Sequence, residues 1–212
     1  RAIRRGNYAT DYALFQQGYA LGLLHRYPEK IQKMEQLSSR YPRSDYADDA
    51  LYETARAHLQ LDQNENAIKM YTRILGKYPN SNKAAKSALE LGMTHRTLKQ
   101  YDKAIEQYQY AGKLATRSYI YSNLAESQIQ LQYYEEAADN IIKAFKEEHF
   151  EDLATDLLAD ANEELTAELM PRLNVQINKN PNSVEWHMYK LYLYRSAKKY
   201  EQAIECTEKI KE

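Results

Sequence analysis

One segment of the sequence recurs at a fixed interval, and this repeat constrains the fold more than any other feature. The stretch RYPRSDYADDA at 40–50 is echoed by KYPNSNKAAKS at 77–87. Tyrosine, proline, serine and alanine recur at equivalent places, each time 37 residues further along the chain. Periods of 20–50 residues are typical of solenoid proteins, in which every structural unit stacks on its neighbours. We therefore expect a solenoid.

Small residues occupy two equivalent positions of each repeat. Two antiparallel helices approach closely only where side chains are small, so the pattern predicts helix–turn–helix units that cross at these positions. The earlier position of a repeat is held by Gly18, Ala55, Gly92 and Ala125. The later position is held by Ala67, Ala104, Ala137 and Ala203.

The 3.6-residue periodicity of apolar side chains predicts an all-α chain of about six antiparallel helix pairs. Tyr-Pro closes the second helix of a pair, because the residue before proline avoids the α-helical region. First helices are expected near 10–24, 45–60, 82–98, 117–131, 150–165 and 183–197. Second helices are expected near 28–40, 64–77, 101–114, 134–147, 168–179 and 200–211.

Composition and motifs argue against several classes of function. The formal net charge is −1 and no basic stripe crosses several repeats, so we expect no nucleic-acid partner. No apolar run approaches 18 residues, so we expect no membrane-spanning segment. Cys206 is the only cysteine, which excludes a disulfide within one chain. His58 and His95 occupy equivalent positions, and we interpret them as packing residues instead of metal ligands. We expect no cofactor and no enzymatic activity.

These residues resemble the tetratricopeptide repeat (TPR) family. The small residues of both helices match its pattern, as do the closing prolines Pro42, Pro79 and Pro181. Trp186 with Tyr189 matches the large residues that open a repeat. The resemblance covers nearly all of 1–212. It implies a single right-handed superhelical solenoid whose first helices line a concave groove for a protein or peptide.

The 37-residue units within 27–110 are similar to a narrower group. They resemble repeats of bacterial periplasmic proteins of the Tol–Pal system and of outer-membrane protein assembly. This resemblance favours the periplasm or cell envelope over the cytoplasm.

Two segments depart from the repeat. The junction AGKLATRS contains no proline, so a change of superhelical pitch is expected near 111–118. In the fifth unit, at 150–180, the two small positions hold Leu158 and Met170. Pro171 follows, and its ring removes a helical hydrogen bond unless it lies in a helix's first turn.

Helical geometry around the small positions assigns side chains to the groove. Aromatic side chains dominate this set, which suits an extended or helical peptide held by apolar contacts. The alternative is that several of these tyrosines pack against the neighbouring repeat. The predicted groove residues are Tyr12, Phe15, Tyr19, Tyr52, Arg56, Met93, Tyr119 and Tyr194.

The leading hypothesis is therefore a non-catalytic scaffold that binds a protein or peptide, with a modest preference for bacterial cell-envelope assembly. The alternative is an assembly module that self-associates or packs on the rest of a longer chain. Apolar residues continue at helical spacing to the C-terminal segment, including Ile204 and Ile210. We expect that the natural chain continues beyond Glu212, or that this end pairs with another molecule.

Overall fold

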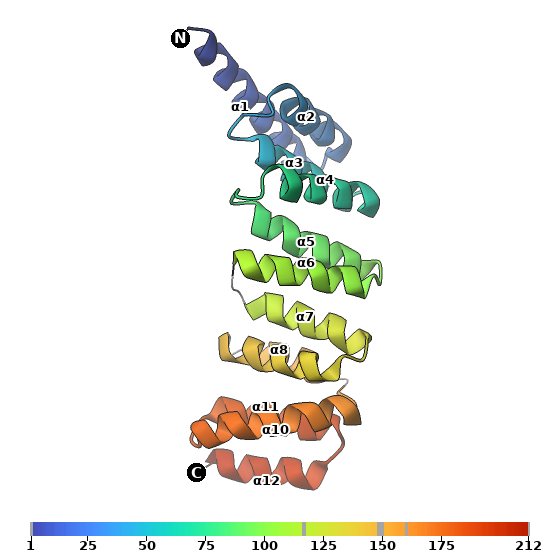
Figure 1. The fold of residues 1–212 in the computed structure, drawn as a ribbon, viewed down its shortest axis with the longest axis vertical. Coiled ribbons are helices and arrows are strands. Elements are labelled where there is room, and N and C mark those ends of the chain that lie inside the picture. Colours follow the sequence, from blue (N-terminus) through green and yellow to red (C-terminus); the bar gives the residue numbers. More distant parts are fainter. Residues whose placement is uncertain (1, 116–117, 148–150, 160, 212) are drawn as a thin grey trace. The chain divides into compact units, whose positions relative to one another are not determined.

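All regular secondary structure in the described part of the protein is α-helical. The computed structural model describes residues 2–115, 118–147, 151–159 and 161–211. Within these ranges the chain forms twelve helices, α1 to α12, and no β-strand (Figure 1). This confirms the predicted all-α class. The chain divides into two compact units, the first unit at 1–98 and the second unit at 99–212.

The first unit holds five helices that pack in sequence. Each contacts the next along the chain, which is the arrangement expected of stacked hairpins. One apolar cluster centres on Met34 and Leu37, and a second centres on Tyr71 and Ile74. The helices are α1 (Ala2–Leu23), α2 (Tyr27–Arg40), α3 (Ala47–Leu59), α4 (Asn64–Lys77) and α5 (Ala84–Thr97).

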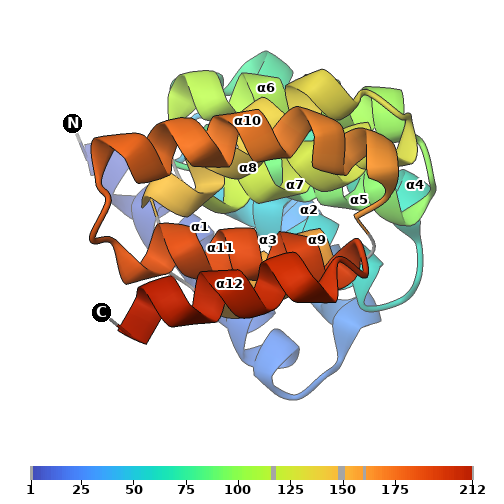
Figure 2. The ribbon, with the colours of Figure 1, turned by 90° about the horizontal axis from the view of Figure 1, so that it is seen from below.

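The second unit holds seven helices, and residues of α7 to α11 form one apolar cluster, in which Phe145 stacks on Tyr189 with ring centroids 4.0 Å apart. Helix α8 contacts both α7 and α10, and α12 lies along α11 (Figure 2). The helices are α6 (Tyr101–Leu114), α7 (Ser118–Gln130), α8 (Tyr134–Glu147), α9 (Glu151–Leu158), α10 (Glu163–Lys179), α11 (Val184–Ser196) and α12 (Tyr200–Lys211).

The small residues of the repeat are buried, except for the half-buried Ala203. Ala55, Ala67 and Ala137 have no exposed surface. At Gly18, an added Cβ would lie 2.7 Å from Met34 Cε, so even an alanine would displace the methionine. Leu158 is fully buried, so the fifth unit fills the equivalent position with a large side chain.

Turns between paired helices use a left-handed residue that sequence analysis did not predict. Gln132 has φ of 63°, and Tyr133 N donates to Gln128 O at 2.8 Å while Gln132 N donates to Ile129 O. This is the Schellman arrangement, which usually employs glycine. The left-handed residues are His25, Asp62, Lys99, Gln132 and Lys198. Their spacing of 37, 37, 33 and 66 residues repeats the spacing of the small alanines.

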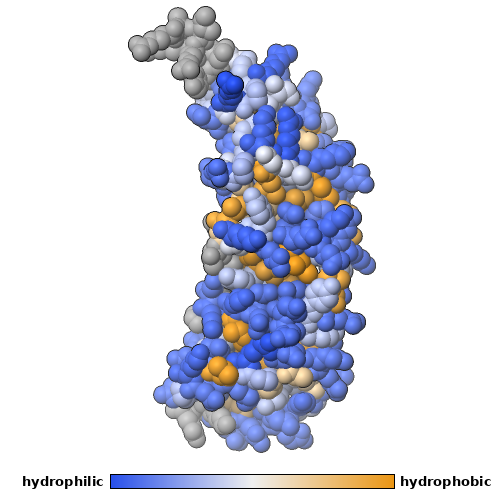
Figure 3. Space-filling view, in the orientation of Figure 1, coloured by the Kyte–Doolittle hydropathy of each residue, from blue (hydrophilic) through white to orange (hydrophobic). Residues whose placement is uncertain are grey.

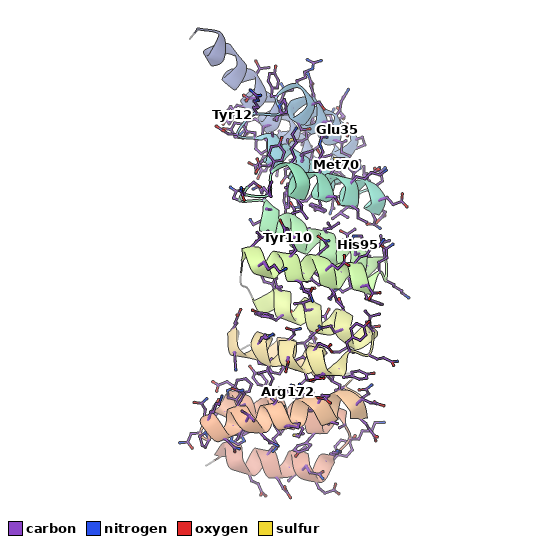
Figure 4. All side chains as sticks on the ribbon, in the orientation of Figure 1. Tyr12, Glu35, Met70, His95, Tyr110 and Arg172 are labelled. Atoms are coloured by element: carbon purple, nitrogen blue, oxygen red, sulfur yellow. The ribbon has the colours of Figure 1, made fainter. Side chains whose placement is uncertain are left out.

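The fifth pair has different boundaries from those expected. Helix α9 ends at Leu158 and α10 begins at Glu163, so Pro171 lies inside α10 and not in its first turn. Helix α10 begins before the expected residue 168 because Asn162 caps it: the Asn162 side chain accepts a hydrogen bond from Leu165 N. The residue after Pro171 is Arg172 (labelled in Figure 4), and its Nη1 donates to Glu168 O at 2.6 Å.

Helix α1 also begins at Ala2, earlier than the expected start near residue 10. Among the described helices, none is long and apolar enough to cross a membrane. Consistent with this, the face shown in Figure 3 is largely hydrophilic.

Candidate functional site

A pocket of about 290 Å³ lies in the first unit, where α1, α2 and α3 meet. Two first helices, α1 and α3, and the second helix α2 supply its walls. Tyr19 and Arg56, both predicted for the groove, line this pocket. The other lining residues are Gly22, Leu23, Tyr27, Lys30, Glu53, Ala57 and Gln60.

An ion pair that sequence analysis missed forms one wall of the pocket. Lys30 Nζ donates to Glu53 Oε2, and only 9% of the Lys30 side chain is exposed. Gly22 makes room for this lysine, because a Cβ on Gly22 would lie 3.1 Å from Lys30 Nζ. A buried lysine requires a partner, and the spacing of the repeat contained no signal for this contact between α2 and α3.

Arg56 is the cation of the pocket that remains available. Its guanidinium Nη1 lies 3.9 Å from Glu53 Oε1, beyond hydrogen-bond distance, and 57% of its side chain is exposed. Glu53 is already engaged by Lys30. The pocket therefore presents one guanidinium and carries an excess of one positive charge.

Tyr19 and Leu23 form the apolar rim of the pocket. Tyr19 is 49% exposed and Leu23 is 68% exposed. Large apolar side chains that remain exposed beside a cation can contact an apolar part of a ligand while its polar part is held.

Tyr52 contacts neighbouring helices inside the first unit. Its ring lies 5.8 Å from that of Tyr71, and its hydroxyl donates to Glu90 Oε1 at 3.4 Å. Burial raises the pKa of Tyr52 to about 12, and the negative charge of Glu90 acts in the same direction. The side chain thus links α3 to α4 and α5.

The remaining predicted residues of the first unit lie apart from the pocket. Tyr12 and Phe15 on α1 both pack on Tyr46, with ring centroids 5.5 Å and 5.3 Å apart (Figure 4 labels Tyr12). Met93 on α5 is 38% exposed.

Two predicted residues belong to the second unit. Tyr119 on α7 is half-buried, and its backbone carbonyl accepts from Asn123 Nδ2 at 2.5 Å. Tyr194 on α11 is also half-buried, with Lys190 Nζ 5.6 Å from the ring centroid. Burial raises the pKa of Tyr194.

The two equivalent histidines lie in the protein interior. His58 and His95 are each 8% exposed, in the last turns of α3 and α5. His58 Nδ1 lies 2.7 Å from Gln63 Oε1 at the start of α4. Within the described ranges, no group of His, Cys, Asp and Glu has the geometry of a metal site.

Two segments of the chain match models of a known repeat family. Residues 49–81 and 85–111 each match a family model described as tetratricopeptide repeat. The chain therefore contains tetratricopeptide repeats in these two segments. These repeats support a protein–protein interaction scaffold.

Solved structures with the same fold have low sequence identity. A tetratricopeptide repeat protein from Parabacteroides merdae aligns with a TM-score of 0.66 and 15% identity, over 95% of this chain and 79% of that one. MamA from Desulfovibrio magneticus aligns with a TM-score of 0.59 and 14% identity, over 95% and 93% of the two chains. These likenesses concern the fold alone. No curated protein sequence matches the chain significantly.

Proposed function

We propose that this TPR protein is a non-catalytic scaffold that holds a peptide or protein segment against its first helices, with the pocket between α1, α2 and α3 as an anchor point. The observation that carries the proposal is the exposed Arg56 guanidinium, which lies 3.9 Å from Glu53 Oε1 and makes no hydrogen bond to it, in a pocket rimmed by Tyr19 and Leu23. A carboxylate or backbone carbonyl of the partner would accept from Arg56, and an apolar side chain would contact the rim.

The remaining predicted groove residues support this proposal to different degrees. Tyr12 and Met93 are exposed enough to contact a ligand. Tyr52, through its contacts with Tyr71 and Glu90, is better suited to support the groove than to anchor a partner.

The test is protein capture by immobilised full-length chain, quantified by mass spectrometry. A Tyr19→Ser, Arg56→Ser double variant should lose the proteins that the unaltered chain retains. The matched control is Tyr133→Ser with Arg73→Ser, because Tyr133 is 48% exposed and Arg73 is an exposed residue of α4. The control should retain them. Equal capture by the pocket variant, with unchanged thermal melting, would place binding elsewhere.

We also propose a role in bacterial cell-envelope assembly. Support comes from the 37-residue units with Tyr-Pro ends at 27–110, which resemble periplasmic repeats. Fractionation of cells that express the complete natural gene tests this point. A product found only in the cytosol would contradict it.

One observation favours a second candidate function, self-association. Helix α12 exposes Tyr200 and Ile204, at 57% and 61%. Pairing of this face with another molecule would bury both. Sedimentation over a range of concentrations should show a dimer that a Tyr200→Ser, Ile204→Ser variant does not form. A strictly monomeric chain at high concentration would exclude this candidate.

A further inference from the structure

Two apolar positions of α12 are exposed, whereas the same positions of the other regular second helices are covered. Tyr200 and Ile204 follow the left-handed residue Lys198 by two and six residues, and both side chains are exposed. At the same distances from the other left-handed residues, every side chain is buried or half-buried. These equivalents are Tyr27, Asn64, Tyr101 and Tyr134 for Tyr200, and Ile31, Ile68, Ile105 and Ala138 for Ile204.

The first helix of the following pair covers these positions elsewhere in the chain. Tyr27 Oη donates to Gln60 Oε1, at the end of α3, over 3.4 Å. Ile68 packs against the apolar cluster that includes Leu91 of α5. Each of α2, α4 and α6 contacts the first helix that comes next. The exposed pair on α12 is therefore a docking face for a helix that has the surface of a first helix.

Helix α1 has the complementary feature, because it exposes a face that other first helices bury. Ala13, Gln17 and Ala20 share one face of α1 and are exposed. Their equivalents lie 37 residues later in α3, a further 37 later in α5 and a further 33 later in α7, and all of them are buried. These equivalents are Ala50, Thr54 and Ala57, then Ser87, Leu91 and Thr94, then Ile120, Leu124 and Ser127.

This face of a first helix receives the second helix that precedes it. Ala50 belongs to the apolar cluster of Met34 and Leu37 on α2. Ile120 Cγ2 is the atom nearest to a Cβ built on Gly112 of α6, at 3.7 Å. Small side chains allow two helices to approach closely, and α1 carries alanine at two of its three exposed positions. Helix α1 therefore presents the kind of surface that a second helix occupies elsewhere in the chain.

We propose that α12 of one molecule stacks on α1 of a second copy, as α2 stacks on α3 within one chain. The inference rests on the self-association proposed above and adds the surface that receives α12. A second copy is the occupant because each chain carries both faces, and each face has the surface that the other one packs against in the repeat. Stacking extends the solenoid from one molecule to the next.

The contacts follow from the equivalent positions of α2 and α3. Tyr27 lines one pocket with Ala57 and Gln60, and the equivalents of these two residues on α1 are Ala20 and Leu23. Tyr200 of one copy therefore lies over Ala20 and Leu23 of the other. Leu23 is exposed and apolar, so an apolar contact takes the place of the hydrogen bond between Tyr27 and Gln60.

The proposed contact is heterologous, because the two molecules contribute different surfaces. Pairing of two α12 faces would instead be isologous, with the same surface from both molecules. Only the heterologous contact can be rebuilt by mixing two variants that each lack one of the surfaces.

Analytical ultracentrifugation of two such variants tests the proposal. The α1 variant, Ala13→Glu with Ala20→Glu, keeps its α12 face, and the α12 variant, Tyr200→Ser with Ile204→Ser, keeps its α1 face. Each variant alone should associate at least about a hundredfold more weakly than the unaltered chain, because docking would bury unpaired carboxylates or lose both apolar contacts. Their equimolar mixture should form a one-to-one dimer with the affinity of the unaltered chain.

The outcomes separate this inference from the functions proposed above. Association of the α1 variant by itself means that two α12 faces pair, which keeps self-association and overturns stacking on α1. Association of the α12 variant by itself, or a mixture that stays monomeric, also overturns the stacking. An unaltered chain that is monomeric at every concentration overturns self-association together with its stacked form. Capture of other proteins through Arg56 is a separate measurement, and its failure leaves these results unchanged.

A matched variant controls for the added negative charge. Thr72→Glu with Gln109→Glu places two carboxylates at exposed positions of α4 and α6, and it should associate like the unaltered chain. Loss of association in this control would show that charge, and not the α1 face, decides the result, which overturns the assignment of α1. Dilute samples of all variants should melt like the unaltered chain, because every altered side chain is exposed.

NMR of the mixed dimer locates the surface that receives α12. The α12 variant is ¹⁵N-labelled and titrated with the unlabelled α1 variant. Saturable shifts should centre on the backbone amides of Ala13, Gln17 and Ala20. Shifts that centre on Arg56 instead would place α12 in the pocket between α1, α2 and α3, and would overturn the α1 face as the receiving surface.

Discussion

The C-terminal ends of α4 and α6 are equivalent in the repeat, yet they differ in the side chains that pack there. At the end of α4, Leu75 and Tyr78 pack against the apolar clusters of the first unit, and the Tyr78 hydroxyl donates to Pro42 O at 2.9 Å. At the end of α6 the same positions hold Gly112 and Ala115. Side chains therefore fill the space at the end of α4, whereas a hollow of about 410 Å³ lies beside the end of α6.

The hollow thus lies beside Gly112, at the position where α4 carries Leu75. The helices themselves keep the same length, since α4 and α6 each contain 14 residues. The Tyr-Pro pair therefore has two roles. It ends the helix, and its tyrosine also connects one repeat to the preceding one.

The largest expected effect on stability concerns Leu158, the large residue at the position where regular repeats carry a small one. Leu158→Ala should lower the free energy of unfolding by about 2–5 kcal/mol, because Leu158 is fully buried and its removal leaves a cavity. Urea denaturation measures the change. Leu114→Ala serves as the control, since Leu114 is 42% exposed on α6 and should be nearly neutral. A neutral Leu158→Ala would mean that the fifth pair is not packed through this position.

The reverse change tests the small crossing position of the first unit. Ala55→Leu should destabilise by about 1–3 kcal/mol, because the crossing of α3 and α4 has no room for a larger side chain. Thermal melting of this variant is compared with that of Ala13→Leu, at an exposed position of α1. If both variants melt alike, close helix approach at Ala55 is not required.

A smaller effect is expected where Tyr78 joins two repeats. Tyr78→Phe removes the hydrogen bond to Pro42 O and should cost about 0.5–1.5 kcal/mol. Tyr133→Phe, at a tyrosine that is 48% exposed, provides the comparison. Equal stability of the two variants would show that the hydrogen bond from Tyr78 to Pro42 O does not stabilise the first unit.

The smallest effect appears only at alkaline pH, at Tyr52. The folded state raises the pKa of this hydroxyl from 10.0 to about 12. The unfolded chain therefore releases this proton first, and the contribution to stability is complete below pH 10 and lost as pH rises toward 12. Tyr52→Phe should make stability fall less steeply over this range than in the unaltered chain. Identical pH profiles of the two proteins would contradict the buried environment of Tyr52.

The helix pattern could be predicted from sequence where the repeat is regular. The bounds of α4, α6, α8 and α12 agree with those expected, because small residues and turn positions recur at constant spacing. The expected bounds of the fifth pair are wrong, because the repeat does not continue through a segment that lacks its small residues. Asn162 followed by two glutamates was a usable local signal for the start of α10.

The candidate site was predictable only in part. Tyr19 and Arg56 were assigned to one face by helical geometry, and the structure brings them into one pocket. That Tyr12 and Phe15 pack on Tyr46, and that Tyr52 contacts Tyr71, depends on side chains from other helices. A periodic pattern identifies the face on which a residue lies but not its neighbour across a helix contact.

In the regular repeats, the sequence alone determined the helical hairpins, their register and their crossing points, because these depend on local periodicity and on side-chain size at repeated positions. Only the tertiary structure decided that Lys30 is buried against Glu53, leaving Arg56 available, and that the glycine at 112 opens a hollow. The physical reason is that ion pairing, burial and cavities arise between segments from different helices. Their energies depend on which side chains meet when the hairpins stack.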